Sequence, residues 1–210
     1  MEGTEVEIAG VRRVGHDTVA LRVASPPGFD ARPGQFVQVR ATVDGDAVTR
    51  HYSISSPDAG ETFELTVGVD PEGTLTPWLA DVERGDTVEV DGPFGRVYYE
   101  DESRVVVLAA GPGVGAGVGV AEAALSGGGG VALVYRTDAP VHEPRLSGLA
   151  AAGADVYVVS DDAAFESAVA GTVGRGQVFV YGFEPFVKAA EAAVRAAGAD
   201  PRTAKVENFG

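Results

Sequence analysis

Polar and apolar residues alternate along short segments of the first hundred residues, which is the pattern of half-buried β-strands. The segments that show it are residues 5–14, 18–25, 34–43, 49–56, 62–69 and 86–95. Turn-forming residues separate them, for example at 57–61. Strands at this spacing predict an antiparallel β-barrel. One short helix is expected within 76–83, with Thr76 as its N-cap and Pro77 at its first helical position.

The pattern changes near residue 100, where strand-like and helix-like segments begin to alternate. Apolar runs typical of buried strands, and a last short strand, are expected at residues 104–111, 131–136, 155–160, 177–182 and 203–210. Helices are expected between them, after the glycine-rich turn at 111–116 and at residues 143–154, 164–173 and 184–198. This alternation predicts a doubly wound α/β domain with a parallel sheet. We therefore expect two domains, at residues 1–100 and 101–210.

The stretch Arg50-His51-Tyr52-Ser53 lies on one of the expected barrel strands. Because side chains alternate along a strand, Arg50 and Tyr52 point to the same face. A guanidinium beside a flat ring suits a ligand that has both a phosphate and an aromatic plane. The alternative is an exposed strand whose arginine pairs with nearby carboxylates, and these four residues alone favour neither interpretation.

Two glycine-containing turns have the form of phosphate sites. At Gly73 the backbone N–H groups can approach an anion, and the start of a short helix favours negative charge. The residues that can offer hydrogen bonds there are Thr74, Leu75 and Thr76. A simple helix cap is the alternative. The turn at 111–116 follows an expected parallel strand and opens a helix, which is the form of a pyrophosphate cradle.

Charge and composition exclude several classes of protein. The 210 residues include 31 acidic and 16 basic side chains, a formal charge of −15, so nucleic-acid binding is not expected. Such an acidic, lysine-poor chain resembles the proteins of extreme halophiles, in which salt screens self-repulsion. Without a membrane-length apolar window or a signal-peptide pattern, we expect a soluble, cytoplasmic protein and no membrane partner. With no cysteine and three scattered histidines, no metal site or iron–sulfur cluster is expected.

The Arg50-to-Ser53 stretch is similar to the Arg-x-Tyr-Ser motif of the ferredoxin–NADP reductase family of flavoproteins, and further family motifs follow in order. The chain resembles that family over nearly its whole length. The resemblance implies FAD on the barrel, with Arg50 on a flavin phosphate, Tyr52 stacked on the isoalloxazine and Ser53 near flavin N5. Strict alternation turns Ser53 to the opposite face, so the strand must bend or the flavin must reach around it. His51 and Val67 complete the expected contacts around the ring.

The two glycine turns also resemble family motifs. Gly73 to Thr76 is similar to the family's Gly-x-x-Ser/Thr turn, which implies that the flavin has two phosphates, as FAD does. The second turn resembles Gly-Thr-Gly-Ile/Val-Ala-Pro, and its candidate nicotinamide dinucleotide contacts are Gly111, Pro112, Gly113, Val114 and Gly115. It departs from the family at three places. Pro112 removes a hydroxyl and a backbone donor, and Gly115 and Ala116 replace alanine and proline.

The last two motifs lie near the expected nicotinamide position. Residues 178–186 resemble the family's Cys-Gly-Pro strand end, with Gly182 kept, Tyr181 in place of cysteine and Phe183 in place of proline. Tyr181 blocks, reshapes or lines the site, and the sequence leaves all three open. Residues 205–210 resemble the family's Val-Glu-x-aromatic segment. The resemblance implies that Glu207 positions the nicotinamide and that Phe209 covers the flavin until nicotinamide displaces it; an ordinary edge strand is the alternative.

The resemblance implies hydride transfer between NAD(P)H and flavin N5, followed by single-electron exchange with a ferredoxin or flavodoxin. Ser53, Glu207 and Phe209 are then the residues at the reacting rings. Arg136 could bind the 2′-phosphate of NADPH, whereas Asp161 and Asp162 suit the free ribose of NADH, and we favour NADH slightly. Two alternatives stay open: a reductase component of an oxygenase or other multi-protein system, and a flavin-binding electron-transfer module that has lost productive nicotinamide binding.

Overall fold

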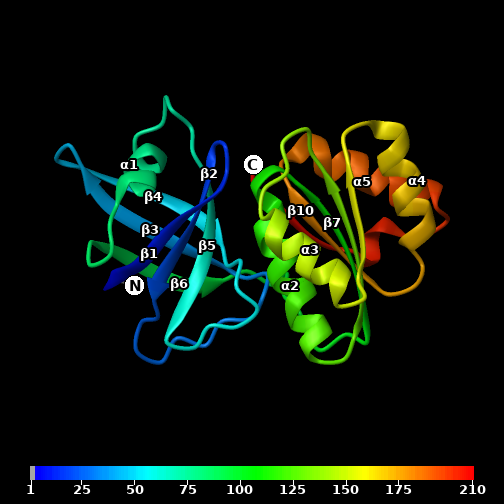
Figure 1. The fold of residues 1–210 in the computed structure, drawn as a ribbon, viewed down its shortest axis with the longest axis horizontal. Helices are drawn as coiled ribbons and strands as arrows, with labels where there is room; N and C mark the ends of the chain where they lie inside the picture. Colours follow the sequence, from blue (N-terminus) through cyan, green and yellow to red (C-terminus); the bar gives the residue numbers. More distant parts are fainter. Residues whose placement is uncertain (1–2) are drawn as a thin grey trace.

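The computed structural model describes residues 3–210, in which two sheets lie side by side (Figure 1). The first is antiparallel and six-stranded, with the order β4-β3-β6-β1-β2-β5. Its strands are β1 (Thr4–Gly15), β2 (Thr18–Ala24), β3 (Phe36–Val43), β4 (Asp46–Ser53), β5 (Thr62–Gly68) and β6 (Thr87–Phe94). A bridge between Ile54 and Leu65 brings the two ends of the sheet together, so the sheet curls into a barrel. This confirms the barrel that the alternating pattern predicts.

The interior of the barrel is filled by the apolar members of each alternating strand. Ile8, Leu21, Val39 and Leu65 are all completely buried there. The short helix α1 (Leu75–Asp81) packs on this core through Leu75 and Leu79. Branched apolar side chains that alternate with polar ones are what a curled sheet with one dry face requires.

Helix α1 begins two residues earlier than the sequence predicts, at Leu75 rather than Pro77, and the expected cap is wrong. Thr74, not Thr76, occupies the N-cap position, and its side chain makes no capping hydrogen bond. The Thr76 hydroxyl instead accepts from the N–H of Asp70 at 3.0 Å and donates to the Asp70 carbonyl at 3.3 Å. Burial of Leu75 in the barrel core accounts for the earlier start, because that side chain must already lie on the inner face of the helix.

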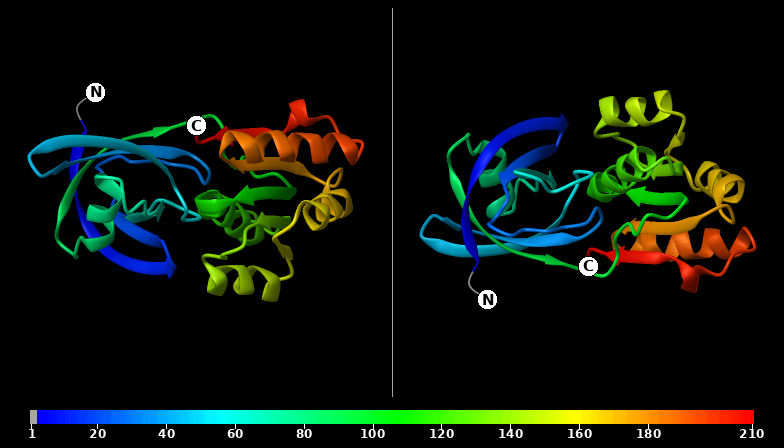
Figure 2. Two further views of the ribbon diagram at one scale, coloured as in Figure 1. Left: turned by 90° about the horizontal axis from the view of Figure 1, so that it is seen from above. Right: turned by 90° about the horizontal axis from the view of Figure 1, so that it is seen from below.

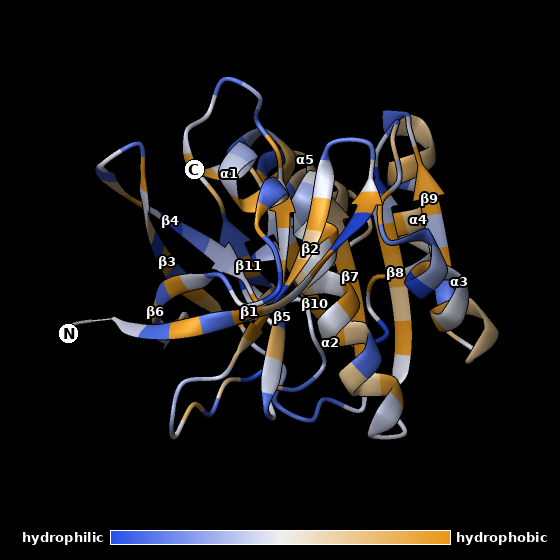
Figure 3. Cartoon of the chain, turned by 60° about the vertical axis from the view of Figure 1, so that its left-hand side comes forward, coloured by the Kyte–Doolittle hydropathy of each residue, from blue (hydrophilic) through white to orange (hydrophobic). Residues whose placement is uncertain are grey.

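The second sheet is parallel and five-stranded, with the order β11-β10-β7-β8-β9. Its strands are β7 (Arg104–Ala110), β8 (Gly130–Arg136), β9 (Asp155–Val159), β10 (Gln177–Gly182) and β11 (Lys205–Asn208). Its helices are α2 (Val114–Ser126), α3 (Glu143–Ala151), α4 (Asp162–Thr172) and α5 (Glu184–Ala196). Helices α2 and α3 share one hydrophobic core with the sheet, and α4 and α5 share another (Figure 2). The doubly wound domain is therefore confirmed, and the interior positions of its central strands β7 and β8 are apolar (Figure 3).

The two sheets are joined by residues 95–103, between the end of β6 at Phe94 and the start of β7 at Arg104. The predicted domain boundary at residue 100 falls within this connection. Lys205 of β11 bonds back to it, with Nζ 2.8 Å from the Tyr98 carbonyl, 2.8 Å from Glu100 and 2.6 Å from Glu102. The connection is thus fixed against the parallel sheet, and β11 is fixed beside the barrel.

A second set of polar contacts joins α2 and α3 to the barrel. His142, which precedes α3, lies 2.8 Å from the Thr66 hydroxyl of β5 through Nε2, and its N–H donates to the Val14 carbonyl at 3.0 Å. Arg145 of α3 contacts Glu64 of β5 at 2.9 Å. Helix α2 approaches so closely that a Cβ on Gly119 would lie 2.9 Å from the carbonyl oxygen of Ser56. The C-terminal edge of the parallel sheet is consequently held against the barrel.

Candidate functional site

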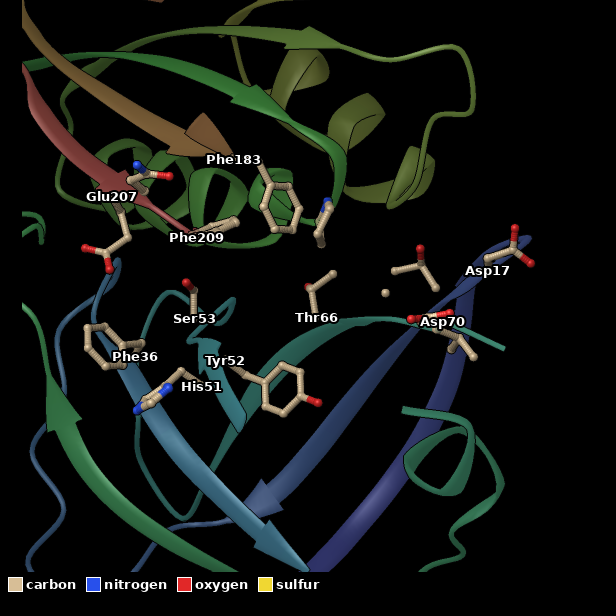
Figure 4. Close-up of a pocket in the computed structure, with 15 residues that line it drawn as sticks. Asp17, Phe36, His51, Tyr52, Ser53, Thr66, Asp70, Phe183, Glu207 and Phe209 are labelled. Carbon is tan, nitrogen blue, oxygen red and sulfur yellow. The ribbon is translucent and has the colours of Figure 1, made fainter. Parts of the chain in front are cut away.

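A cavity of about 670 Å³ lies where the barrel meets the C-terminal ends of β10 and β11 (Figure 4). We call it the junction cavity. It is lined by 15 residues: Asp17, Thr18, Phe36, His51, Tyr52, Ser53, Thr66, Gly68, Val69, Asp70, Pro112, Phe183, Glu207, Asn208 and Phe209. Six of them belong to the sequence-predicted site: His51, Tyr52, Ser53, Pro112, Glu207 and Phe209. Residues more than 150 positions apart therefore meet at one cavity.

His51, Tyr52 and Ser53 all line the cavity, although strict alternation places Tyr52 on one face of the strand and His51 and Ser53 on the other. The reason is a change of pairing partner at the end of β4. Ser53 still pairs with Phe36 of β3, whereas Ile54 bridges to Leu65 of β5. The strand therefore bends between the two edges of the sheet, and the bend brings Ser53 to the cavity.

Tyr52 carries a buried hydroxyl without a hydrogen-bond partner among residues 3–210. Burial raises the pKa of this phenol to about 12, and the Arg50 charge opposes the shift. The hydroxyl therefore stays protonated at neutral pH and is a free donor within the cavity wall. An unpartnered buried donor is costly, so a polar ligand group is the expected partner.

The opposite wall comes from β11 and the loop after β10. The N–H of Phe209 donates to the Gly182 carbonyl at 3.0 Å, which holds this segment beside β10. Burial raises the pKa of the Glu207 carboxyl above its ordinary value. The rings of Tyr52 and Phe209 lie on opposite sides of the cavity, with Ser53 between them (Figure 4). Glu207 lies at the end of the cavity where Phe36 lies. A flat, ring-shaped ligand with polar edges fits this arrangement.

Four residues that were predicted to contact a cofactor do not line the junction cavity. Val67 and Leu75 are buried in the barrel core, because β5 turns Thr66 and Gly68 to the cavity and Val67 inward. Val114 is buried in the α2 face of the parallel sheet. At Gly115 a Cβ would clash with the Thr66 side chain, so this glycine allows α2 to approach the barrel. At these positions only backbone groups could meet a ligand, and their cofactor contacts stay predictions.

The remaining predicted residues surround the cavity without lining it. Gly113 and Gly182 are packed in the parallel sheet, where a Cβ would clash with the Tyr181 carbonyl and with the Phe186 ring respectively. Gly111 has φ +53° and open space where a Cβ would stand, which suits a turn that a ligand approaches. Gly73 and Thr74 lie in the turn before α1, where the N–H of Gly73 donates to the carbonyl of Asp70, itself a lining residue.

Two arginines with predicted phosphate roles lie outside the cavity. Arg50 is exposed on β4, and its Nη1 donates to the carbonyl of Thr49 at 2.8 Å. Arg136, at the end of β8, forms an ion pair with Asp162 at 2.5 Å. Asp161 beside it caps α4 by accepting from the N–H of Ala164 at 2.8 Å. The phosphate roles of both arginines stay predictions.

Tyr181 neither blocks nor lines the junction cavity. Its side chain is completely buried on the α2 face of the sheet, where it stacks on Phe179 at 6.3 Å. Its hydroxyl reaches Gly34 at the barrel, and burial raises its pKa well above the ordinary value. Of the three possibilities left open by the sequence, direct blocking and direct lining are therefore wrong, because the cysteine position of this strand faces the domain core.

Several lining residues were not predicted from the sequence. Phe36, Thr66 and Gly68 lie on strands whose inward and cavity-facing positions depend on how the barrel closes. Asp17 and Asp70 come from turns, and turn residues are commonly acidic for reasons unrelated to a ligand. Only Phe183 carried a usable signal, a large apolar residue directly after a strand and before a helix.

Comparison with known proteins agrees with this geometry. Residues 5–99 match the oxidoreductase FAD-binding domain family. An Amycolatopsis cytochrome P450 reductase has the same fold, with a TM-score of 0.80 and 25% identity over 98% of this chain and 70% of its own. The chain is thus similar to flavoprotein reductases, in sequence over residues 5–99 and in fold over nearly its whole length. A ferredoxin NADP⁺ reductase from Neisseria gonorrhoeae, solved with FAD and NADP, shares the fold of this chain, with a TM-score of 0.76 and 17% identity over 99% and 98% of the two chains.

Curated relatives match this chain over shorter stretches. The glycine betaine monooxygenase reductase subunit of Chromohalobacter salexigens is 36% identical over 98 residues, 45% of this chain and 27% of its own. The toluate 1,2-dioxygenase electron transfer component of Pseudomonas putida is 31% identical over 112 residues, 52% of this chain and 33% of its own. The chain thus spans about a quarter to a third of the length of these relatives. The family match confirms FAD as the flavin of the barrel.

Two further findings concern the described part of the chain as a whole. Across residues 3–210, no helix has both the length and the apolar character needed to cross a membrane. The same residues contain no group of three or more His, Cys, Asp or Glu side chains that could hold a metal ion.

Proposed function

We propose that the protein is an FAD-dependent reductase that oxidises NAD(P)H and delivers electrons one at a time to a ferredoxin or flavodoxin. Bound FAD would supply the redox chemistry, because it accepts a hydride and releases electrons singly. The observation that carries the proposal is the junction cavity, where Tyr52 and Ser53 of the barrel face Glu207 and Phe209 of the other domain. A ring held by the first pair lies within reach of a nicotinamide held by the second.

In this proposal the chain supplies alignment rather than acid–base chemistry. Tyr52 provides a flat surface for the flavin and a donor for its polar tail, and the Ser53 hydroxyl lies at the N5 edge. Phe209 covers the other ring face and gives way to the nicotinamide, which Glu207 orients. Alignment of this kind contributes much of the rate, because reacting atoms must approach to about 3–3.5 Å.

Rapid mixing of the purified yellow protein with NADH or NADPH tests the proposal. We expect NADH or NADPH to bleach the flavin absorbance within seconds of mixing. We expect added ferredoxin or flavodoxin to restore the absorbance. Each reaction should be run at low and at molar KCl, because we also propose that the acidic surface is an adaptation to high salt in the cytoplasm. A protein that is isolated colourless and does not take up FAD would contradict the proposal at its base.

A reductase component of an oxygenase is the second candidate, and the relatives of the chain support it. Those relatives include reductase and electron-transfer components of a monooxygenase and a dioxygenase system. An acceptor assay distinguishes the two candidates, because a component of an oxygenase should reduce its terminal oxygenase faster than a free ferredoxin. A third candidate, a flavin module without productive nicotinamide binding, predicts no bleaching with either nicotinamide. The buried position of Tyr181 weakens that candidate, although Pro112 still lines the cavity.

We further propose that the protein prefers NADH. The ion pair with Asp162 occupies Arg136, the basic residue that could otherwise hold a 2′-phosphate. Replacement of Asp162 by asparagine should free the guanidinium and shift preference towards NADPH. Exposed ion pairs are worth up to about 1 kcal/mol, so the ratio of NADPH to NADH affinity should rise by at most about fivefold. The ratio of the two half-saturation concentrations for flavin bleaching measures it.

The matched control for Asp162→Asn is Asp155→Asn. Asp155 pairs with Arg104 at 3.1 Å at the opposite end of the same sheet, and it should leave the ratio unchanged. An unchanged ratio in Asp162→Asn as well would show that Arg136 does not meet the ribose end of the nucleotide.

Replacement of Arg50 by alanine should weaken FAD binding. Arg50 donates to one backbone carbonyl, Thr49, and its remaining N–H groups are directed to solvent or ligand. Loss of a charge-assisted bond to a phosphate costs roughly 1.5–3 kcal/mol, or about 10- to 150-fold in dissociation constant. Fluorescence titration of the apoprotein with FAD provides the measurement.

Arg40→Ala is the control for this prediction. Arg40 lies on the neighbouring strand β3, contacts Glu89 at 3.1 Å and is also exposed. It should change FAD affinity by less than twofold. Equal FAD affinity in Arg50→Ala and Arg40→Ala would assign the phosphate to another residue.

A further inference from the structure

Phe183 is an apolar side chain that the hydrophobic cores do not use. It follows β10 directly, occupies the N-cap position of α5 and is 51% exposed. Its ring nevertheless extends into the junction cavity, on the same side as Phe209 (Figure 4). A large exposed phenyl ring contributes little to the stability of the fold. We therefore expect this ring to act on whatever occupies or covers the cavity.

The Phe183 ring meets Phe209 edge to face. The ring centroids are 5.8 Å apart and the planes are at 90°. This is one of the favoured geometries of aromatic pairs, in which the positive edge of one ring meets the negative face of the other. The pair is therefore a specific contact and not merely two neighbouring apolar groups.

The backbone on both sides of Phe183 fixes this pair. Gly182, the residue before it, accepts from the N–H of Phe209 at 3.0 Å. Glu184, the residue after it, donates its N–H to the carbonyl of Gly210 at 3.3 Å. The backbones of the two phenylalanines are thereby joined, so the freedom left to Phe209 is rotation of its ring. Phe209 also packs against the core on the α2 side of the sheet, and Phe183 restrains the ring from the cavity side.

We propose that Phe183 is a positioning residue that holds the Phe209 ring over the flavin side of the junction cavity and so limits access of the nicotinamide. The inference rests on the proposed function, because it gives Phe209 the role of a cover. Phe183 stands where the resemblance to the family implies proline, which has no aromatic edge. In this chain the phenyl ring of Phe183 therefore restrains the covering ring of Phe209, which a proline could not do in the same way. Removal of the Phe183 ring should make displacement of Phe209 easier and leave the flavin more exposed.

The experiment uses the FAD-loaded protein and compares Phe183→Ala, Phe209→Ala and the double variant. Oxidised NAD⁺ and NADP⁺ are titrated by difference absorbance, so that binding is measured without turnover. Edge-to-face pairs stabilise by an amount equivalent to roughly 2- to 12-fold in equilibrium constant. We expect Phe183→Ala to bind the preferred nucleotide tighter by a factor in this range. In the Phe209→Ala background the same replacement should leave the nucleotide affinity unchanged, because Phe183 then has no covering ring to restrain.

A second readout needs no nicotinamide at all. Quenching of flavin fluorescence by acrylamide should increase in Phe183→Ala and should be equal in Phe209→Ala and the double variant. Tyr157→Ala is the control: Tyr157 is an aromatic residue of the same domain, is 40% exposed and lies outside the cavity. It should leave both readouts at the wild-type value.

The outcomes separate this inference from the proposed function. If the unaltered protein binds neither nucleotide and fails to bleach, the proposed function is wrong, and the quenching series still decides whether Phe183 restrains Phe209. Weaker nucleotide binding in Phe183→Ala would overturn the inference, because Phe183 would then contact the nucleotide itself. An equal effect of Phe183→Ala with and without Phe209 would overturn it too, since the two rings would act independently.

Discussion

Replacement of Arg145 by methionine is expected to lower the free energy of unfolding by about 3 kcal/mol, at the lower end of the range for breaking a buried ion pair. Its guanidinium donates to both Glu122 oxygens at 2.8 and 2.7 Å, to Glu64 at 2.9 Å and to the Ser55 carbonyl at 2.6 Å. The Arg145 side chain is only 17% exposed. Its removal leaves Glu122 without this cation, whereas Glu64 keeps only the more exposed Arg12, at 3.2 Å. We choose the lower end because Glu64 and Glu122 keep some contact with water.

The partners of Arg145 belong to three segments, and this makes the effect larger than that of a surface pair. Glu122 lies on α2, Glu64 on β5, and Ser55 between β4 and β5. The arginine thus joins the α/β domain to the wall of the barrel. Its loss should loosen the junction cavity as well as lower stability, so FAD dissociation is also expected to accelerate.

Urea unfolding of the FAD-free protein at fixed KCl, followed by circular dichroism, measures the change in stability. Arg202→Met is the control, because Arg202 is highly exposed and pairs only with Asp200 across one turn. Neutralising both carboxylates, as in Arg145→Met with Glu64→Gln and Glu122→Gln, should restore part of the loss, since the repulsion is then removed. A loss in Arg145→Met no larger than in Arg202→Met would mean that the cluster is too well hydrated to hold the domains together.

The two sheets could be predicted because their signals are local. In β2 and β5 the polar and apolar positions follow the two-residue period of a strand that has one dry face. In β7 and β8 every interior position is apolar, as a strand covered by helices on both sides requires. Neither signal depends on which strand is the neighbour. The fold was therefore readable, although its register was not.

The site could be predicted only in part, because the sequence does not show which neighbouring group requires a glycine at a given position. The turn at 111–116 reads as a phosphate cradle throughout. In the structure Gly111 is open, whereas Gly115 is required by the Thr66 side chain of the barrel. That difference depends on a contact between residues 49 positions apart. Alternation likewise gave no account of Ser53, since the bend at the end of β4 results from its change of partner from β3 to β5.

The polar contacts between the domains were not predicted at all. His142 was interpreted as one of three scattered histidines, yet it is completely buried and bonded to Thr66. Its backbone has φ +57°, which is uncommon for a residue with a side chain. A single histidine in a polar stretch carries no sign that a strand 76 residues earlier will cover it. Burial of this kind is a property of the docked domains.

Stability of the protein is expected to fall steeply below pH 6.5 because of this buried histidine. Burial, with smaller contributions from the positive charges of Arg145 and Arg12, lowers the pKa of His142 to about 3. In the unfolded chain the ring regains its ordinary pKa of about 6.5. Between these two values the unfolded state binds a proton that the folded state does not, so acid favours unfolding. The contribution is fully present above pH 6.5 and is lost as the pH falls towards 3.

The expected slope is up to about 1.4 kcal/mol per pH unit, or roughly 2 kcal/mol between pH 6.5 and 5 from this one ring. His142→Asn is the comparison, because asparagine does not titrate and tolerates a positive φ. The variant loses the bond to Thr66, but that loss is the same at every pH and shifts the whole curve. Other titrating groups contribute equally to both proteins and cancel in the difference. Urea unfolding at half-unit steps should therefore give curves that converge on acidification; curves that stay parallel would mean that the ring is charged within the folded junction.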